Sequence, residues 1–203
     1  MIICDGVPGS IEWLTDKLGK PSASNYDKIL TPEKMEKSKT REPYLYDLCS
    51  ERISGEVKEG FKSFDMLRGN EKEADAVTAY EFLKDVEIQK VGFCLDDNIR
   101  YGASPDGLIG EDGGVEIKCP KLITHHGYVK DNALPREYKL QVLGNLLVTK
   151  REWWDFMSYF PNIEPFYIRV YAEDYKDDIA MLESELEKFC DDLDSLYKLL
   201  TNR

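Results

Sequence analysis

Apolar residues along the 203-residue chain recur with two different periods, one typical of helices and one typical of strands. Recurrence every three to four residues predicts helices over residues 10–19, 22–30, 41–53, 63–83, 135–149 and 174–200. Alternation of apolar and polar residues predicts strands over residues 86–95, 99–103, 106–110, 114–119, 152–160 and 165–172. Two further segments, residues 31–41 and 120–134, follow neither pattern and are expected to form loops.

Helices before and after a central group of strands predict an α/β fold, in which a mixed β-sheet is flanked by helices. The length predicts a single domain over residues 1–203. Within it, we expect a helical N-terminal part of about residues 1–84 to pack on a core of about residues 85–203.

The most specific pattern is a short strand that mixes apolar and charged residues. Val115 and Ile117 alternate with Glu116 and Lys118. Because successive side chains of a strand point to opposite faces, Glu116 and Lys118 should project from the same face. The apolar residues should fill the other face, so that the charged pair is held on a rigid sheet.

A glycine-rich turn precedes this strand and permits a tight hairpin. The hairpin would pair the strand with the residues that follow Asp106. Asp106 is therefore expected beside Glu116, although ten residues separate them. The glycines of the turn are Gly110, Gly113 and Gly114.

Two converging carboxylates suit a hard cation such as Mg²⁺, and the backbone carbonyl of Ile117 is a candidate further ligand. A bound cation makes water easier to deprotonate and neutralises charge on a phosphate. Lys118 beside it could orient the water, deprotonate it or stabilise the transition state. Glu-x-Lys alone is common in ordinary strands, but its combination with Asp106 and the hairpin predicts a metal-dependent phosphodiesterase.

The net charge of −12 is unusual for a protein that acts on nucleic acid. Residues 173–195 hold ten acids against two bases and so account for −8 of it, whereas residues 117–169 hold eight bases against five acids. The acidity therefore belongs mostly to one C-terminal helix, expected to be a solvated face. The middle of the chain is mildly basic, and binding to a DNA duplex would still need basic residues gathered in a groove.

Other sequence features bound the class of protein. No apolar run of about 18 residues occurs, so we expect no membrane span. The first residues lack the pattern of a signal peptide. The five cysteines contain no Cys-x-x-Cys, which disfavours a zinc or iron–sulfur site and favours free thiols in a reducing cytoplasm. Adjacent His125 and His126 are left out of the metal site, although a minor contact with DNA stays open.

The block Ser104-Pro105-Asp106-Gly107, followed by Glu116-Ile117-Lys118-Cys119-Pro120, resembles the phage lambda-exonuclease type of alkaline nuclease. This family lies within the PD-(D/E)xK nuclease superfamily, whose core is restriction-endonuclease-like, and is related to the YqaJ-like viral recombinases. The resemblance covers roughly residues 10–200.

Three further segments are similar to that family. Trp13, then Lys17-Leu18-Gly19 and Ser22-Ala23-Ser24, resembles a segment whose arginine and serine contact the 5′ phosphate of DNA, which implies this role for Lys17 and Ser24. Lysine stands where arginine is usual, and it cannot form the bidentate fork. Residues 68–73 resemble a helix whose glutamate, here Glu73, helps to hold a second cation. Tyr138-x-x-Gln141 resembles a helix whose glutamine positions water or phosphate.

The resemblance implies a 5′→3′ exonuclease of linear double-stranded DNA that releases mononucleotides. It would leave a 3′ single strand for recombination by strand annealing. It further implies two Mg²⁺ ions per site, with Mn²⁺ as a substitute, a ring-shaped homotrimer and a single-strand annealing protein as partner. The expected location is the cytoplasm, that of the host cell if the protein is phage-encoded. Two alternatives remain: an endonuclease of the same superfamily, and an inactive DNA-binding module.

Overall fold

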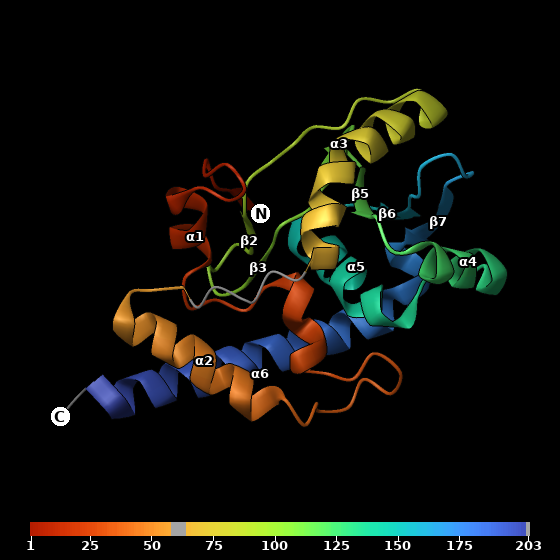
Figure 1. Ribbon diagram of the computed structural model, residues 1–203. Helices are drawn as coiled ribbons and strands as arrows, with labels where there is room; N and C mark the ends of the chain where they lie inside the picture. The colour runs from red at the N-terminus through yellow and green to blue at the C-terminus, as the bar shows by residue number, and fades with distance from the viewer. Residues whose placement is uncertain (58–63, 202–203) are drawn as a thin grey trace.

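A four-stranded mixed sheet forms the centre of the computed structural model, which describes residues 1–57 and 64–201 and, for residues 64–71, the backbone only. The strands are β4 (Gly107–Ile109), β5 (Gly113–Lys118), β6 (Trp153–Ser158) and β7 (Phe166–Tyr171), in that spatial order. β5 and β6 are parallel, and the two outer strands run antiparallel to their neighbours. The predicted α/β architecture with a mixed sheet is confirmed (Figure 1).

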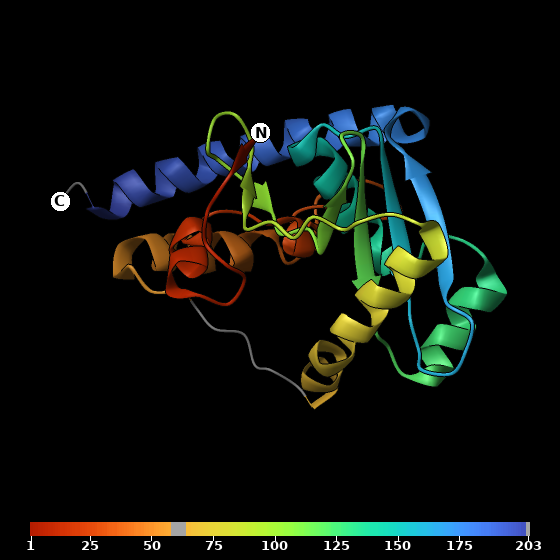
Figure 2. The same ribbon diagram turned by 90° about the horizontal axis from the view of Figure 1, so that it is seen from above.

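Helices cover both faces of this sheet (Figures 1 and 2). The apolar face of β5 packs under α3 (Phe64–Lys84), where Val115 and Ile117 join Tyr80 in one buried cluster. On the opposite face lies α5 (Arg136–Thr149), and Leu143 of this helix and Phe156 of β6 belong to a second, larger buried cluster. The polar residues of β5 therefore face α5, as the two-residue period of the strand predicts.

The parallel pair β5 and β6 needs a long crossover, which α4 (Leu122–Asp131) and α5 supply. The prediction of a loop over residues 120–134 was wrong, because most of this segment is α4. Gly127 and several β-branched residues give it a weak intrinsic helix propensity. Tertiary packing supplies the stability instead, since Tyr128 is buried edge-on against Phe156 and Tyr138.

The N-terminal residues pair with a strand from the middle of the chain. β1 (Ile2–Ile3), β2 (Cys94–Leu95) and β3 (Gly102–Ala103) form a small antiparallel sheet. α1 (Ile11–Lys17) follows, with Ser10 accepting from the N–H of Trp13 as an N-cap. The predicted helix over residues 22–30 is the 3₁₀ helix η1 (Ala23–Lys28).

η1 packs directly on α5, the helix above the charged face of β5. Gly144 permits this approach, because a Cβ atom there would lie 2.6 Å from the ring of Tyr26. Ser22, just before η1, also bridges to Gly102 of β3. This connection brings the Ser22–Ser24 segment alongside the strand that leads to Asp106.

α2 (Arg41–Ser54) lies beside the long α6 (Lys176–Thr201), which follows the 3₁₀ helix η2 (Ala172–Tyr175) (Figures 1 and 2). The expectation that the acids of α6 are only solvated was wrong. Arg100 forms ion pairs with Glu187, Asp191 and Asp194, and Arg41 and Arg52 of α2 pair with Asp192 and Asp194. Part of the acidity therefore balances arginines that dock α2 and the turn before β3 onto α6.

Two of the predicted strands are much shorter than expected, and a tight turn lies between them. Residues 86–95 and 99–103 contribute only β2 and β3 to the strands. The Asp96 carboxylate accepts from the N–H groups of Asn98, Arg100 and Tyr101, and Ile99 has a positive φ of 62°. These side-chain contacts take over the hydrogen bonds that a longer hairpin would have made.

The glycines before Glu116 serve two purposes. Gly110 has a φ of 53° and forms the expected turn. Gly113 and Gly114 instead lie within β5, where a Cβ atom would meet the rings of Trp153 and Trp154 at 2.0 and 2.3 Å. They leave room for the two tryptophan rings of β6, which any larger side chain at these positions would meet.

Ser63, the predicted start of the helix over residues 63–83, lies outside the described residues. Within the part of the chain that the structure describes, none of the helices combines the length and apolar composition of a membrane span.

Candidate active site

Asp106 lies just before β4 and is tied to the end of β5. Its Oδ2 accepts a 2.6 Å hydrogen bond from the N–H of Ile117. β4 pairs only with residues 113–115 of β5, so the edge of β5 at Ile117 extends beyond the end of β4. Because the N–H and C=O of one strand residue point to the same edge, the Ile117 carbonyl also faces the side of Asp106. Asp106 and the Ile117 carbonyl, two of the predicted oxygen ligands, therefore lie on one edge of β5.

Glu116 is 1% exposed and accepts hydrogen bonds on both carboxylate oxygens. Its Oε1 accepts from Lys118 Nζ at 2.5 Å and from Gln141 Nε2 at 2.6 Å. Its Oε2 accepts from Asn145 Nδ2 at 3.0 Å. Gln141 and Asn145 are one turn apart on α5, so the crossover helix supplies two of the three donors.

Lys118 is held in its charged form. Burial alone would lower its pKa, but the adjacent carboxylates of Glu116 and Asp106 outweigh burial and raise the pKa above its ordinary value. The ammonium also lies 5.1 Å from the ring centroid of Tyr138. A lysine kept protonated favours charge stabilisation or orientation of water over deprotonation of water.

The Asp106 carboxyl group, by contrast, is disfavoured in its charged form. Burial, followed by the charge of Glu116, raises its pKa to about 8, and Glu73 adds a smaller effect in the same direction. A carboxyl group whose ionised form is opposed by burial and by a neighbouring carboxylate is a ligand that a divalent cation stabilises in its charged form. The residues present therefore fit the predicted metal.

Glu73 is half-buried on α3 and near enough to influence Asp106 electrostatically. Among the side chains that the structure describes, however, no group of three or more His, Cys, Asp or Glu residues is arranged to hold a metal ion. The structure thus brings Asp106, Glu116, Lys118 and Gln141 together, whereas Glu73 remains a predicted ligand.

Lys17 and Ser24, the predicted contacts of a 5′ phosphate, lie on α1 and η1. Lys17 Nζ lies 3.8 Å from the ring centroid of Trp13, and burial lowers its pKa to about 8 against the opposing charge of Glu51. Ser24 is exposed, with its Oγ 3.4 Å from Ser22 Oγ. In the described parts of the chain, neither side chain hydrogen-bonds to Asp106 or Glu116.

The paired histidines face different environments. His125 is fully buried on α4, with Nδ1 2.9 Å from Ser158 Oγ, while His126 is exposed. Of the two, only His126 is accessible to a ligand.

A family model for the YqaJ-like viral recombinase domain matches residues 12–152, which include Asp106, Glu116, Lys118 and Gln141. The chain belongs to this family. The YqaJ-family match covers α1 through α5 and ends just before β6. A comparison with curated proteins found no significant match.

Solved structures resemble this YqaJ-family protein over nearly its whole length. The alkaline exonuclease LHK-Exo of Laribacter hongkongensis is 31% identical, with a TM-score of 0.86 over 95% of this chain and 97% of that chain. A second structure of LHK-Exo, in complex with dAMP, has a TM-score of 0.85, the same identity and the same coverage. A phage-related exonuclease from Haemophilus somnus 129PT is 18% identical, with a TM-score of 0.62 over 87% of this chain and 95% of that chain, and shows the fold alone.

Sequence reasoning missed Asn145, the third donor to Glu116. It follows Gln141 by four residues, within a stretch that is otherwise apolar or glycine. A polar residue at this spacing from a predicted site residue shares its helix face, and that signal was available.

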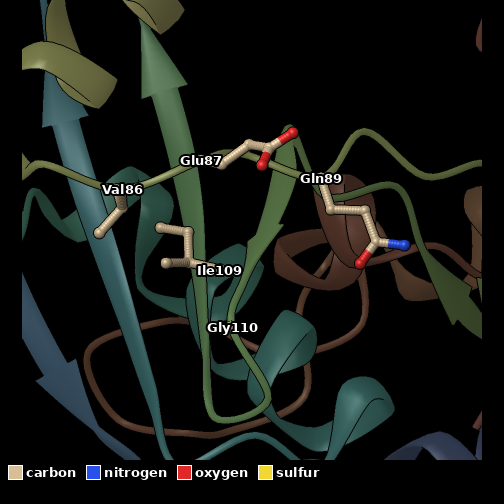
Figure 3. A pocket seen from close by; sticks show the side chains of 5 residues that line it. All are labelled: Val86, Glu87, Gln89, Ile109 and Gly110. Carbon is tan, nitrogen blue, oxygen red and sulfur yellow. The ribbon is translucent and has the colours of Figure 1, made fainter.

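A separate hollow lies at the outer edge of the sheet, beside β4 (Figure 3). It is lined by Val86, Glu87, Gln89, Ile109 and Gly110. The lining contains a single carboxylate and no lysine. It lacks the paired acids that mark the Asp106–Glu116 site.

Proposed function

We propose that this YqaJ-family protein is a Mg²⁺-dependent exonuclease that digests linear double-stranded DNA in the 5′→3′ direction. It would release mononucleotides and leave a 3′ single strand for recombination by strand annealing. The observation that carries the proposal is the arrangement of Asp106, Glu116 and Lys118 on the β4–β5 hairpin.

The likeness to LHK-Exo supports an exonuclease activity, because the chains are similar over almost their full lengths. The dAMP in one structure of that protein supports a mononucleotide product. The 5′→3′ direction rests on the resemblance of the Lys17–Ser24 segment to end-binding residues.

Asp106, Glu116 and the Ile117 carbonyl would hold the first Mg²⁺, and Glu73 would help to hold a second; Mn²⁺ has the same ligand preference. When bound, the metal would acidify water and offset charge on the scissile phosphate. Lys118 would orient that water and stabilise the charge that develops on phosphate oxygens. Gln141 would fix the Glu116 carboxylate and contribute to positioning water or phosphate.

Ser24 and Lys17 would bind the terminal 5′ phosphate. Two contacts support a place near the metal site: the bridge from Ser22 to Gly102, and the packing of η1 on α5 at Gly144. Gly102 precedes Asp106 by four residues in the chain, and Gly144 lies one turn from Gln141 on α5. Lysine would supply charge to the phosphate without the geometry of an arginine fork.

A ring-shaped homotrimer, a single-strand annealing partner and a cytoplasmic location complete the proposal. They rest on the resemblance to the lambda-exonuclease type and stay predictions. A ring would keep the enzyme on one DNA end through successive cleavages.

End-labelled DNA distinguishes the proposal from its alternatives. Linear duplex labelled at the 5′ ends should release labelled mononucleotide at once, whereas 3′-labelled duplex should retain its label until late in digestion. A covalently closed circle should stay intact. Cutting of the circle would indicate an endonuclease, and DNA binding without Mg²⁺-dependent cleavage would indicate an inactive module.

A further inference from the structure

Asn145 is a buried amide whose described side-chain partner is the Glu116 carboxylate. The residue is 0% exposed and donates from Nδ2 to Glu116 Oε2 at 3.0 Å. Its own Oδ1 is buried and has no hydrogen-bond donor among the described residues. The amide is thus satisfied on one side only.

An asparagine in this environment is costly for the fold. Its helix neighbours Leu143, Leu146 and Val148 are all buried in the apolar cluster. A buried acceptor without a donor is destabilising, and a leucine of similar size would avoid that cost. What Asn145 provides in return is its contact with Glu116.

That contact completes the hydrogen bonding of the carboxylate. A carboxylate has about four acceptor positions, two on each oxygen. Lys118 and Gln141 occupy those of Oε1, and Asn145 occupies one of Oε2. One position on Oε2 remains for a cation.

The last torsion of a glutamate side chain is broad, so a carboxylate held from one oxygen alone can still rotate. Donors on both oxygens remove this freedom. Because Asn145 is fully buried, it acts through Glu116 and not on DNA, in contrast to the half-buried Gln141.

We propose that Asn145 is a positioning residue, which holds the Glu116 carboxylate so that the remaining acceptor position of Oε2 is available to a divalent cation. This inference rests on the proposed metal-dependent function. Residues that hydrogen-bond to metal ligands change metal affinity by about 10–100-fold when they are removed.

Binding of Mn²⁺ to the full chain without DNA, followed by electron paramagnetic resonance, tests the inference independently of cleavage. Asn145→Leu removes the donor at similar volume and should weaken Mn²⁺ binding about 10–100-fold. The matched control is Thr149→Val. It removes a buried hydroxyl one turn further along α5, which donates to the backbone carbonyl oxygen of Asn145. This control should bind Mn²⁺ as the wild type does.

Kinetics on linear duplex provide a second readout. In Asn145→Leu, the Mg²⁺ concentration for half-maximal rate should rise by the same factor, while kcat at saturating Mg²⁺ stays within a few-fold. A purely structural role would lower thermal stability and leave the Mg²⁺ requirement unchanged. Asn145→Ala carries the same expectation if circular dichroism shows that leucine prevents folding.

The outcomes separate the two proposals. Wild-type affinity for Mn²⁺ in both Asn145 variants overturns the role of Asn145 and leaves the nuclease proposal standing. Mn²⁺ binding by the wild type without DNA cleavage overturns the nuclease proposal and leaves the role of Asn145 standing. Absence of Mn²⁺ binding in the wild type overturns the role of Asn145, and the cleavage assay with Mg²⁺ decides the nuclease proposal separately.

Discussion

Asp106 and Ile117 are joined by a hydrogen bond of 2.6 Å, from the backbone N–H of Ile117 to the Asp106 carboxylate. The bond crosses from the residue before β4 to the unpaired edge of β5 and keeps Asp106 beside Glu116. With burial, this proximity raises the pKa of Asp106 to about 8. A bound cation stabilises the charged form of a carboxyl group whose pKa is raised in this way.

The raised pKa of Asp106 predicts how stability depends on pH. Its ordinary value is 3.8, so between there and about 8 the carboxyl group is ionised in the unfolded chain and protonated in the folded one. The metal-free protein should therefore lose stability as pH rises through this range, and Mg²⁺ should restore it. Thermal unfolding at several pH values, with and without Mg²⁺, measures both effects.

The isosteric Asp106→Asn variant is the control for this dependence. Without metal it should be at least as stable as the wild type near neutral pH, with a shallower decline. Mg²⁺ should raise its melting temperature little. An equally steep decline in the variant would show that another group is responsible.

Lys118→Met should abolish most cleavage, also in protein that circular dichroism shows to be folded. The ammonium is held charged against Glu116, and its removal takes away charge stabilisation in the transition state. We expect kcat at saturating Mg²⁺ to fall by about 10²–10³-fold. The control is Lys198→Met, at an exposed position near the end of α6. It removes the same charge 80 residues after Lys118 in the sequence and should keep wild-type activity. A loss of less than tenfold in Lys118→Met would remove Lys118 from the chemistry.

The charged face of β5 could be predicted from the sequence because it depends only on the geometry of the strand and of the adjacent turn. A strand alternates its side chains geometrically, so Glu116 and Lys118 had to share a face. Gly110 permits the turn that brings Asp106 back beside them. Gln141 came from the resemblance alone, since sequence spacing does not show that α5 crosses above Glu116.

Other features depend on contacts between distant segments and could not be derived from local pattern. α4 forms from a sequence of weak helix propensity because Tyr128 is buried against Phe156. The acidic face of α6 is organised by Arg100, which lies 87 residues before Glu187 in the sequence. In each case tertiary packing overrode the local tendency.

Recognition of the 5′ phosphate should depend on pH through Lys17. Burial lowers the pKa of Lys17 to about 8, so the ammonium is lost as pH rises through that value. The preference for 5′-phosphorylated over 5′-hydroxyl duplex should therefore weaken above about pH 8 in the wild type. Lys17→Arg should retain the preference, because a guanidinium stays charged. The ratio of initial rates on the two substrates across this range measures the effect, and indifference of the wild type to the phosphate at every pH would contradict it.

Arg169 should matter for stability rather than for cleavage. It forms a bidentate ion pair with Asp155, which is 1% exposed and also accepts from the Tyr80 hydroxyl. Arg169→Met leaves that carboxylate buried without its cation and should lower the free energy of unfolding, measured in urea, by about 2–3 kcal/mol. The expected loss is smaller than for a fully buried ion pair because the Arg169 side chain is 37% exposed. The double variant with Asp155→Leu should recover much of the loss. No recovery would show that the two side chains act separately.

The most direct test of the proposed metal-dependent nuclease is the release of acid-soluble nucleotides from linear double-stranded DNA. Wild-type protein should release them with Mg²⁺ and not with a chelator, and Asp106→Ala should release almost none at the same Mg²⁺ concentration. Intact duplex after incubation with the wild type and Mg²⁺, or undiminished release by Asp106→Ala, would contradict the account.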